Sequence, residues 1–247
     1  MALVHEFENS GNWLFRRRGW LPLFMVVAGI VMMYLGNRQA LIFDLRDEMI
    51  FLGISLFGQI IRISTVGFAA RNTSGRNTAA GQIADELNIT GIYSIVRHPL
   101  YVGNFFMWLG PVLFLKSAWF TVVFCLLYWL YYERIIFAEE QFLRRKFVDE
   151  YDKYSEKVSA FFPFTFKFIR PKLRFSLRNV LSREYNSFLN IFLIFAVLDF
   201  CRNYFLTEKF FFTKIWIYMF AGAAAIWIIV RSIHKYTKWL EVRAADL

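Results

Sequence analysis

The chain has 247 residues, of which 57% are hydrophobic and 20% are aromatic. A soluble domain of this length has no core large enough for 30 Phe and 8 Trp side chains, so the composition excludes an ordinary soluble protein. The net charge of +10 would suit nucleic acid, but the basic residues follow the ends of apolar segments, and anionic lipid head groups explain that pattern more simply. The composition therefore predicts an integral membrane protein without a nucleic-acid partner.

Six apolar segments follow one another along the chain, and each approaches the length of about 20 residues that crosses a bilayer core. They cover residues 20–34, 49–68, 101–115, 118–137, 187–206 and 216–233. The first follows Arg16, Arg17 and Arg18 as a secretory signal would, but no small-residue cleavage site comes after it, so we expect it to be retained. The predicted fold class is all-α, a polytopic membrane helix bundle with about six transmembrane helices.

The distribution of basic residues predicts the topology. Of the 29 Lys and Arg residues, 22 fall in segments on the side of the N-terminus, 6 fall on the opposite side, and Arg62 lies within the second apolar segment. Cytoplasmic segments carry the excess of Lys and Arg in membrane proteins. We therefore expect a multi-pass protein of the cytoplasmic (inner) membrane with both termini in the cytoplasm, and the lipid bilayer as a partner.

Residues 139–158 carry apolar or aromatic side chains three or four positions apart, which predicts a cytoplasmic amphipathic helix. The plainest interpretation of such a helix is that it lies on lipid. The aromatic run 161–164 contains Pro163 and suits a buried or re-entrant turn, and a basic stretch follows it. We divide the chain into N-terminal transmembrane helices with a cytoplasmic loop (1–84), a central part (85–165), and a basic interfacial segment with the last two transmembrane helices (166–247).

Polar residues flank the third and fourth apolar segments. Arg97 and His98 precede Pro99, which is compatible with the first turn of a helix, so the free N–H groups of that turn predict an anion-binding helix end. Glu139 and Glu140 follow the fourth segment. Taken singly, the Arg would reach lipid head groups, the His would cap the helix, and the carboxylates would be a solvated helix start. Together they favour a functional site, because ionisable groups at membrane depth are costly.

Metal chemistry is not expected. The two cysteines, Cys125 and Cys201, both fall inside apolar segments, and their spacing is typical neither of a metal site nor of a disulfide framework.

The polar pattern resembles the superfamily of isoprenylcysteine carboxyl methyltransferases and phospholipid methyltransferases over about residues 85–165. The resemblance rests on Gly91, Tyr93, Arg97, His98, Pro99, Tyr101, Gly103, Glu139, Glu140, Leu143, Phe147, Tyr151, Tyr154 and Pro163. The family usually has Gly after the Phe, where this chain has Val148, and we expect that departure to affect packing more than chemistry.

The resemblance implies that residues 85–165 form a catalytic core that binds S-adenosylmethionine at the cytoplasmic face. It implies a cofactor site made of Gly91, Tyr93, Arg97, His98, Tyr101, Glu139 and Glu140. The chemistry agrees, because carboxylates accept hydrogen bonds from an amine or a ribose diol and tyrosine rings attract a sulfonium cation.

A membrane lipid is the expected acceptor. An anionic oxygen needs positioning by cations, and Arg62 and Arg134 are the candidates for that catalytic role. We therefore favour O-methylation of a lipid phosphate or carboxylate, and the plan of the chain also resembles a lipid A phosphate methyltransferase. Phospholipid N-methylation, an NADPH-dependent sterol-reductase-like activity and a non-enzymatic membrane interaction protein remain open alternatives.

Overall fold

A computed structural model describes residues 2–20, 22–70, 77–78, 81–82, 84–164, 167–237 and 239–240. Its helices are α1 (Leu3–Arg17), α2 (Leu23–Leu35), α3 (Leu45–Gly67), α4 (Pro99–Phe114), α5 (Ala118–Ser155), α6 (Leu177–Thr207) and α7 (Lys214–Tyr236). The described elements also include two short 3₁₀ turns, η1 (Arg38–Leu41) and η2 (Ile92–Ser94). Two strands of two residues each, β1 (Asn77–Thr78) and β2 (Gly81–Gln82), pair as an antiparallel hairpin. The predicted all-α class is confirmed. Residues 71–76, 79–80 and 83 of the expected loop after α3 lie outside the described residues.

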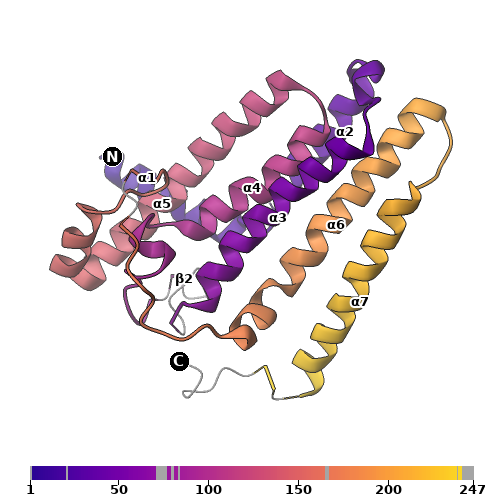
Figure 1. Cartoon of the computed structure of the whole chain (residues 1–247). Helices are drawn as coiled ribbons and strands as arrows, with labels where there is room; N and C mark the ends of the chain where they lie inside the picture. Colours follow the sequence, from indigo (N-terminus) through magenta and orange to yellow (C-terminus); the bar gives the residue numbers. More distant parts are fainter. Residues whose placement is uncertain are drawn as a thin grey trace.

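Four helices, α3, α5, α6 and α7, are long and apolar enough to cross a membrane, and α2 and α4 are shorter apolar helices. All six expected apolar segments are therefore helical. The helices run side by side, with α7 at one edge next to α6 and with α1 beside α5 (Figure 1). Particular residues end the two shorter helices. Helix α4 begins at Pro99 and stops before the turn at Lys116, and α2 ends at Gly36.

Three parts of the chain differ from the expectations. Helix α1 was not anticipated. The residues of the expected amphipathic helix lie in the outer part of α5, which runs to Ser155 but is kinked at Val148, so a short helical segment follows the kink. Helix α6 begins at Leu177, so the end of the basic stretch is helical. Apolar patterns locate the membrane-crossing part of a helix, but they carry little information about how far the helix continues beyond the membrane.

Val148 interrupts α5 with a φ of 36° and a ψ of −112°. This is the left-handed side of backbone space, which a β-branched residue rarely adopts and glycine adopts freely. The Val148 side chain is 58% exposed. The expectation that this position matters for packing was therefore wrong, because it is the backbone that needs glycine there.

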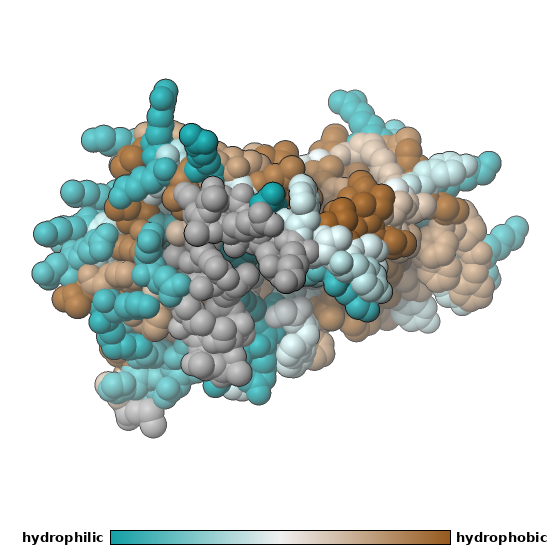
Figure 2. All heavy atoms as spheres, turned by 90° about the horizontal axis from the view of Figure 1, so that it is seen from below, coloured by the Kyte–Doolittle hydropathy of each residue, from teal (hydrophilic) through white to brown (hydrophobic). Residues whose placement is uncertain are grey.

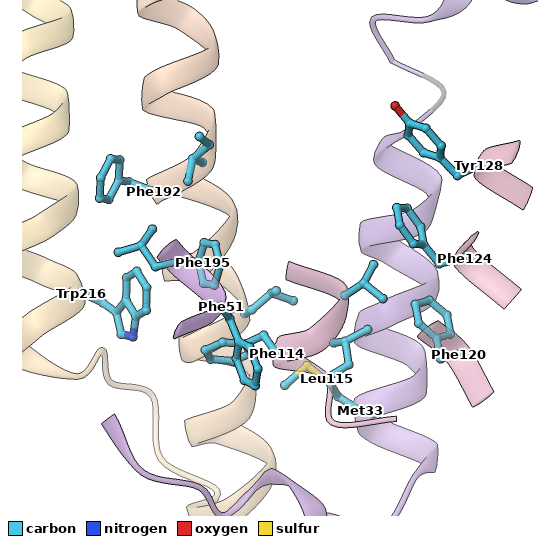
Figure 3. Packing of buried hydrophobic residues seen from close by; sticks show 14 of the residues in the cluster. Met33, Phe51, Phe114, Leu115, Phe120, Phe124, Tyr128, Phe192, Phe195 and Trp216 are labelled. Carbon is cyan, nitrogen blue, oxygen red and sulfur yellow. The ribbon is translucent and has the colours of Figure 1, made fainter. Parts of the chain in front are cut away.

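Aromatic side chains fill the core between α3, α4, α6 and α7 (Figure 3). The rings of Phe195 and Trp216 stack with centroids 5.1 Å apart, and Phe114 meets Phe195 edge-on at 5.8 Å. Helices α3 and α4 cross closely because Gly58 faces Gly103, where an added Cβ would collide with the opposite backbone. This crossing places the end of α3 beside the start of α4.

A buried polar network lies at the far end of the bundle from the Arg97–His98 motif. Arg202 on α6 binds Glu48 and Asp199, each at 2.7 Å, and the Trp216 indole donates to Glu48 at 2.5 Å. Asp199 also accepts a hydrogen bond from the backbone N–H of Thr213 at 2.7 Å. These contacts join the start of α3 to the α6–α7 connection.

The run 161–164 only partly behaves as the expected buried turn. Phe161 packs on Phe105 and Trp129, but Phe162 and Phe164 are exposed. Pro163 is exposed as well. The run is therefore a surface segment anchored by its first residue.

Candidate active site

The start of α4 is fixed by the segment that follows α5. His98 is the N-cap of α4 and Pro99 occupies its first turn, as the motif predicts. The backbone N–H of Arg97 donates to the Ser159 carbonyl at 2.9 Å, and that of His98 donates to the Ala160 carbonyl at 3.1 Å. These bonds hold the motif against the segment that follows α5, beside the part of α5 that carries the paired carboxylates.

Five of the predicted cofactor residues form one hydrogen-bonded group, which we call the Arg-His-Glu cluster: Arg97, His98, Tyr101, Glu139 and Glu140. The Arg97 guanidinium donates to Oε1 of Glu140 through Nε at 2.9 Å and Nη2 at 2.7 Å. His98 Nε2 lies 3.1 Å from the same oxygen, and His98 Nδ1 lies 3.6 Å from Oε2 of Glu139. The Tyr101 hydroxyl donates to Oε2 of Glu139 at 2.7 Å. The structure thus brings the two sequence motifs together.

The charges of this cluster are balanced. Burial alone would lower the pKa of His98, but hydrogen bonds to Glu139 and Glu140 and the charges of these carboxylates outweigh it and raise that pKa to about 9. His98 is therefore a cation at neutral pH. Together with Arg97 it neutralises the two glutamates.

The helix end offers fewer free donors than expected. Pro99 has no N–H group, and the N–H groups of Tyr101 and Val102 both donate to the His98 carbonyl. An anion at this end would therefore depend on the side chains of Arg97 and His98 more than on the backbone.

Gly91 and Tyr93 belong to a turn that leads into the cluster. Gly91 has a φ of 65°, a conformation that favours glycine, and its N–H donates to the Ile169 carbonyl at 2.8 Å. The Tyr93 carbonyl accepts a hydrogen bond from the Tyr154 hydroxyl at 2.6 Å. Gly91 thus shapes the wall of the site, and the outer part of α5 holds that wall.

Tyrosines on α5 extend the site toward the membrane. Tyr101 and Tyr132 have ring centroids 4.7 Å apart, and Tyr132 and Tyr128 stack at 4.3 Å. The Asn104 amide donates to the Tyr132 hydroxyl at 3.1 Å. Sequence reasoning missed Asn104 and Tyr132, although Asn104 lies one helical turn after Tyr101 and Tyr132 lies two turns before the glutamates.

One buried hydroxyl in the site has no hydrogen bond of normal geometry. The Tyr151 side chain is fully buried, and its hydroxyl has no hydrogen-bond partner among the described residues. Glu140 acts on it electrostatically. The hydroxyl therefore faces Glu140 at the edge of the cluster, where a polar ligand would meet both groups.

Arg62 is already bound by a carboxylate. Its guanidinium donates to Glu184 on α6 through Nε at 2.8 Å and Nη2 at 2.7 Å, and its Nη1 donates to Asn104 at 2.7 Å. Gln59 also donates to Glu184, at 3.1 Å. This pairing leaves Arg62 no excess charge for an acceptor. Glu184 was missed, although it is the first carboxylate after a long basic stretch.

Arg134 faces α1 rather than the cluster. Its guanidinium lies 3.2 Å from the centroid of the Phe7 ring. Gly11 of α1 packs against the Arg134 carbonyl and Ala138, where a side chain would clash. Arg134, a candidate for positioning the acceptor, therefore contacts α1 and is not part of the Arg-His-Glu cluster.

Helix α1 brings a different cation toward the site. Glu8 binds Arg145 and Gly11 packs on Arg134, so α1 and α5 run antiparallel and the end of α1 lies beside the tyrosines of α5. Arg18 at this end stacks on Phe15 at 3.9 Å and acts electrostatically on Glu139 and Tyr132. Sequence reasoning used Arg18 only for topology.

Two cavities adjoin the tyrosines. One has a volume of about 290 Å³ and runs from Glu140 past Ile136 and Trp129 to Phe161 and Phe162. The other has a volume of about 390 Å³ and lies between α2, α4 and α5, with Pro22, Trp108 and Tyr131 in its wall. Both are lined by Tyr128 and Tyr132 and are otherwise mostly apolar. The smaller cavity reaches the Arg-His-Glu cluster at Glu140, and the larger one reaches only the tyrosines beside it.

Comparison with known proteins identifies the family. A family described as "Phospholipid methyltransferase" matches residues 49–150, which include the whole Arg-His-Glu cluster. The chain is 38% identical over 114 residues to a protein-S-isoprenylcysteine O-methyltransferase of Schizosaccharomyces pombe, covering 45% of this chain and 48% of the relative. It is 31% identical over 151 residues to the nickel-cobalt-cadmium resistance protein NccN of Alcaligenes xylosoxydans xylosoxydans, covering 60% of this chain and 67% of that protein.

A probable isoprenylcysteine O-methyltransferase of Oryza sativa subsp. indica is 34% identical over 110 residues, which cover 44% of this chain and 57% of the relative. The chain thus spans about half the length of the isoprenylcysteine methyltransferases that it matches. No solved structure gives a significant match.

Proposed function

Because this chain belongs to the superfamily of isoprenylcysteine carboxyl methyltransferases and phospholipid methyltransferases, we propose that it is a membrane-embedded enzyme that transfers a methyl group from S-adenosylmethionine to a lipid-borne acceptor. The observation that carries the proposal is the Arg-His-Glu cluster. It assembles residues 97–101 and 139–140 within the family-matched segment, at the edge of a mostly apolar cavity that Glu140 lines.

The residues of the cluster fit the polar groups of this cofactor. Glu139 and Glu140 accept hydrogen bonds from an amine or a diol, and Arg97 and His98 bind a carboxylate. Tyr101 and Tyr132 present aromatic faces to a sulfonium cation. The unpartnered Tyr151 hydroxyl is a further polar contact beside Glu140.

When bound, S-adenosylmethionine would supply a methyl group: the nucleophile attacks the methyl carbon in line with the C–S bond, and S-adenosylhomocysteine leaves as a neutral thioether. The protein then has to align the acceptor and exclude water. The tyrosines, Phe161 and Trp129 provide a dry wall for that purpose. The cavities suit the hydrocarbon part of a lipid, because their walls are mostly apolar.

For the acceptor we favour an anionic oxygen, either a carboxylate or a phosphate such as that of lipid A. The O-methyltransferase names of the relatives support oxygen as the acceptor atom. Arg18, at the end of α1 that lies beside the tyrosines of α5, is a candidate for holding the acceptor's charge, whereas Arg62 acts through Asn104 on Tyr132 and Arg134 supports α1. Phospholipid N-methylation is the second candidate, because the matching family is described as phospholipid methyltransferase.

Binding of S-adenosylmethionine tests the cofactor site. We expect Glu140→Gln and His98→Ala to abolish binding measured by calorimetry on the purified full chain, because each loses a charge-assisted contact typically worth about 1.5–3 kcal/mol. Glu150→Gln, on the exposed part of the same helix, is the matched control and should bind normally. Normal binding by both site variants would reject the site.

Lipid mass spectrometry of cells with and without the protein tests the acceptor. The gain of one methyl group on a phosphate- or carboxylate-bearing lipid supports O-methylation, and methylated amine head groups support the second candidate. Arg18→Gln should keep cofactor binding and lose the product if the acceptor is anionic. A normal product level in Arg18→Gln would remove Arg18 from the acceptor site.

A further inference from the structure

A surface segment outside the family-matched region carries concentrated positive charge. We call it the basic strap, and it comprises residues 167–176, with Lys167, Arg170, Lys172 and Arg174 all exposed. Between Glu156 and Glu184 the chain has seven basic residues and no acidic one. None of the four strap cations forms a salt bridge with any described residue. Their charges therefore have no counter-charge within the described protein.

The strap is bonded to the turn that carries the site. The Ile169 carbonyl accepts from the Gly91 N–H at 2.8 Å, and the Ile169 N–H donates to the Ser94 hydroxyl at 2.9 Å. At its other end, the Ser176 N–H donates to the Gly67 carbonyl of α3 at 2.8 Å. Arg97 follows Ser94 by three residues, so any movement of the strap reaches the cluster through a short length of chain.

The strap lies where lipid head groups would be. In Figure 1 it runs along the lower edge of the molecule to the start of α6, a helix that crosses the membrane. Phe168, Ile169 and Phe175 are 54%, 50% and 46% exposed, which would be unfavourable in open water. Figure 2, seen from below, shows hydrophilic side chains spread over this end beside apolar ones. Interleaved cations and aromatic rings are typical of segments at an anionic membrane surface.

We propose that the basic strap docks on the anionic head groups of the adjacent leaflet, and that this docking orders the Gly91–Ser94 turn and so tightens the cofactor site. Anionic lipid thus regulates cofactor binding, in addition to surrounding the transmembrane helices. The second half of this inference rests on the proposed binding of S-adenosylmethionine, and the first half does not.

The physical reason is repulsion among uncompensated charges. Four exposed cations within ten residues repel one another on a neutral surface, and that repulsion favours a more extended strap over the fixed path that its bonds to the turn impose. An anionic surface reverses the balance, because each cation near it gains roughly a fivefold preference for the surface. The backbone bonds at Ile169 then remain closed, and the wall of the site stays in place.

The test uses the full chain in nanodiscs of phosphatidylcholine alone and of phosphatidylcholine mixed with phosphatidylglycerol. Calorimetry measures the affinity for S-adenosylmethionine in both, and native mass spectrometry counts the phosphatidylglycerol molecules retained per chain. The test variant is Lys172→Gln/Arg174→Gln. The matched control is Lys209→Gln/Lys214→Gln, which removes the same charge beside the exposed Phe210 at the opposite end of the bundle.

We expect the wild type and the control to bind the cofactor at least about threefold more tightly in the anionic discs, an effect within the reach of two surface cations. The test variant should lose this difference and retain fewer anionic lipids. Equal affinity of the wild type in the two discs overturns the proposal, as does equal lipid retention by the wild type and the test variant. Loss of cofactor binding in every disc, with strap-dependent lipid retention, would instead count against the proposed function and support the docking surface.

Discussion

His98 is held between two carboxylates, and this position determines its charge. Its ring lies 3.1 Å from Glu140 and 3.6 Å from Glu139 and stacks on Tyr101 at 5.7 Å between centroids. Burial opposes protonation, but the two glutamates outweigh it, and the pKa of His98 rises from 6.5 to about 9. The protonated His98 side chain therefore links the start of α4 to the two glutamates of α5.

Because the folded-state pKa of His98 is raised, its stabilising effect is complete below pH 6.5 and is lost as the pH rises through about 9. We expect the wild type to melt above His98→Gln at pH 6, and the gap in melting temperature to shrink between pH 6.5 and 9. Thermal denaturation of both proteins in detergent across this range measures the gap. His5→Gln, on the exposed side of α1, is the control. A gap that does not depend on pH would contradict the raised pKa.

Val148 bears a backbone conformation that its side chain disfavours, with a φ of 36°. Such a residue typically costs about 1–3 kcal/mol. Val148→Gly should therefore raise the free energy of unfolding by about 1 kcal/mol, measured from unfolding midpoints in detergent. Val122→Gly, at an equally exposed position in the regular part of α5, should lower it by about 1 kcal/mol. Equal destabilisation by both changes would refute the assignment of strain at Val148.

Helices α3 and α6 are joined by an ion pair on the site side and by another at the far end. Arg62 binds Glu184, and Arg202 binds Glu48, with carboxylates that are 4% and 5% exposed. Loss of one partner of such a pair lowers the free energy of unfolding, because the other partner remains buried and charged. The site-side pair also holds Asn104, and through it Tyr132, in place.

Arg62→Met should lower the free energy of unfolding by about 3–5 kcal/mol, because it leaves Glu184 buried without a partner. The double variant Arg62→Met/Glu184→Met should recover much of that loss, since no charge is then left unpaired. Unfolding in detergent measures both. Arg145→Met, which breaks the more exposed pair with Glu8, should cost less than about 1 kcal/mol. If the double variant were less stable than Arg62→Met, the pair would not be the reason for the loss.

At the scale of the whole molecule, the helices from α2 to α7 alternate in direction and the two polar networks lie at opposite ends. The cluster, the strap and the ends of α3 and α5 share one end, while Lys116 and Asp47 pair at the other end at 2.5 Å. The excess of basic residues lies at the end of the cluster, and we propose that this end faces the cytoplasm.

Cysteine labelling tests that orientation. With Cys125 and Cys201 replaced by Ala, we expect Lys209→Cys to react with a membrane-impermeant maleimide on intact cells, and Lys157→Cys to react only after permeabilisation. Both positions are exposed, so access to the side chain does not limit the reaction. Labelling of Lys157→Cys on intact cells would reverse the proposed topology.

The sequence by itself determined the class of the fold and the members of the Arg-His-Glu cluster. Hydropathy is local, so it identified all six apolar helices, and Pro99 marked the start of α4. The spacing of Arg97, His98, Tyr101, Glu139 and Glu140 predicted residues that the structure assembles into one cluster. Local patterns did not reveal α1, the continuation of α5 through Ser155, or the conformation of Val148.

Only the tertiary structure decided which charges are already neutralised and which remain available. Arg62 looked like a free cation until Glu184, 122 residues away, was seen to bind it, and Arg134 turned out to lie on Phe7 of α1. Arg18 and the basic strap gained their importance in the same way, through contacts with distant segments. The reason is physical: hydropathy and helix starts depend on neighbouring residues, whereas the state of a buried charge depends on whichever groups folding places within a few ångströms of it.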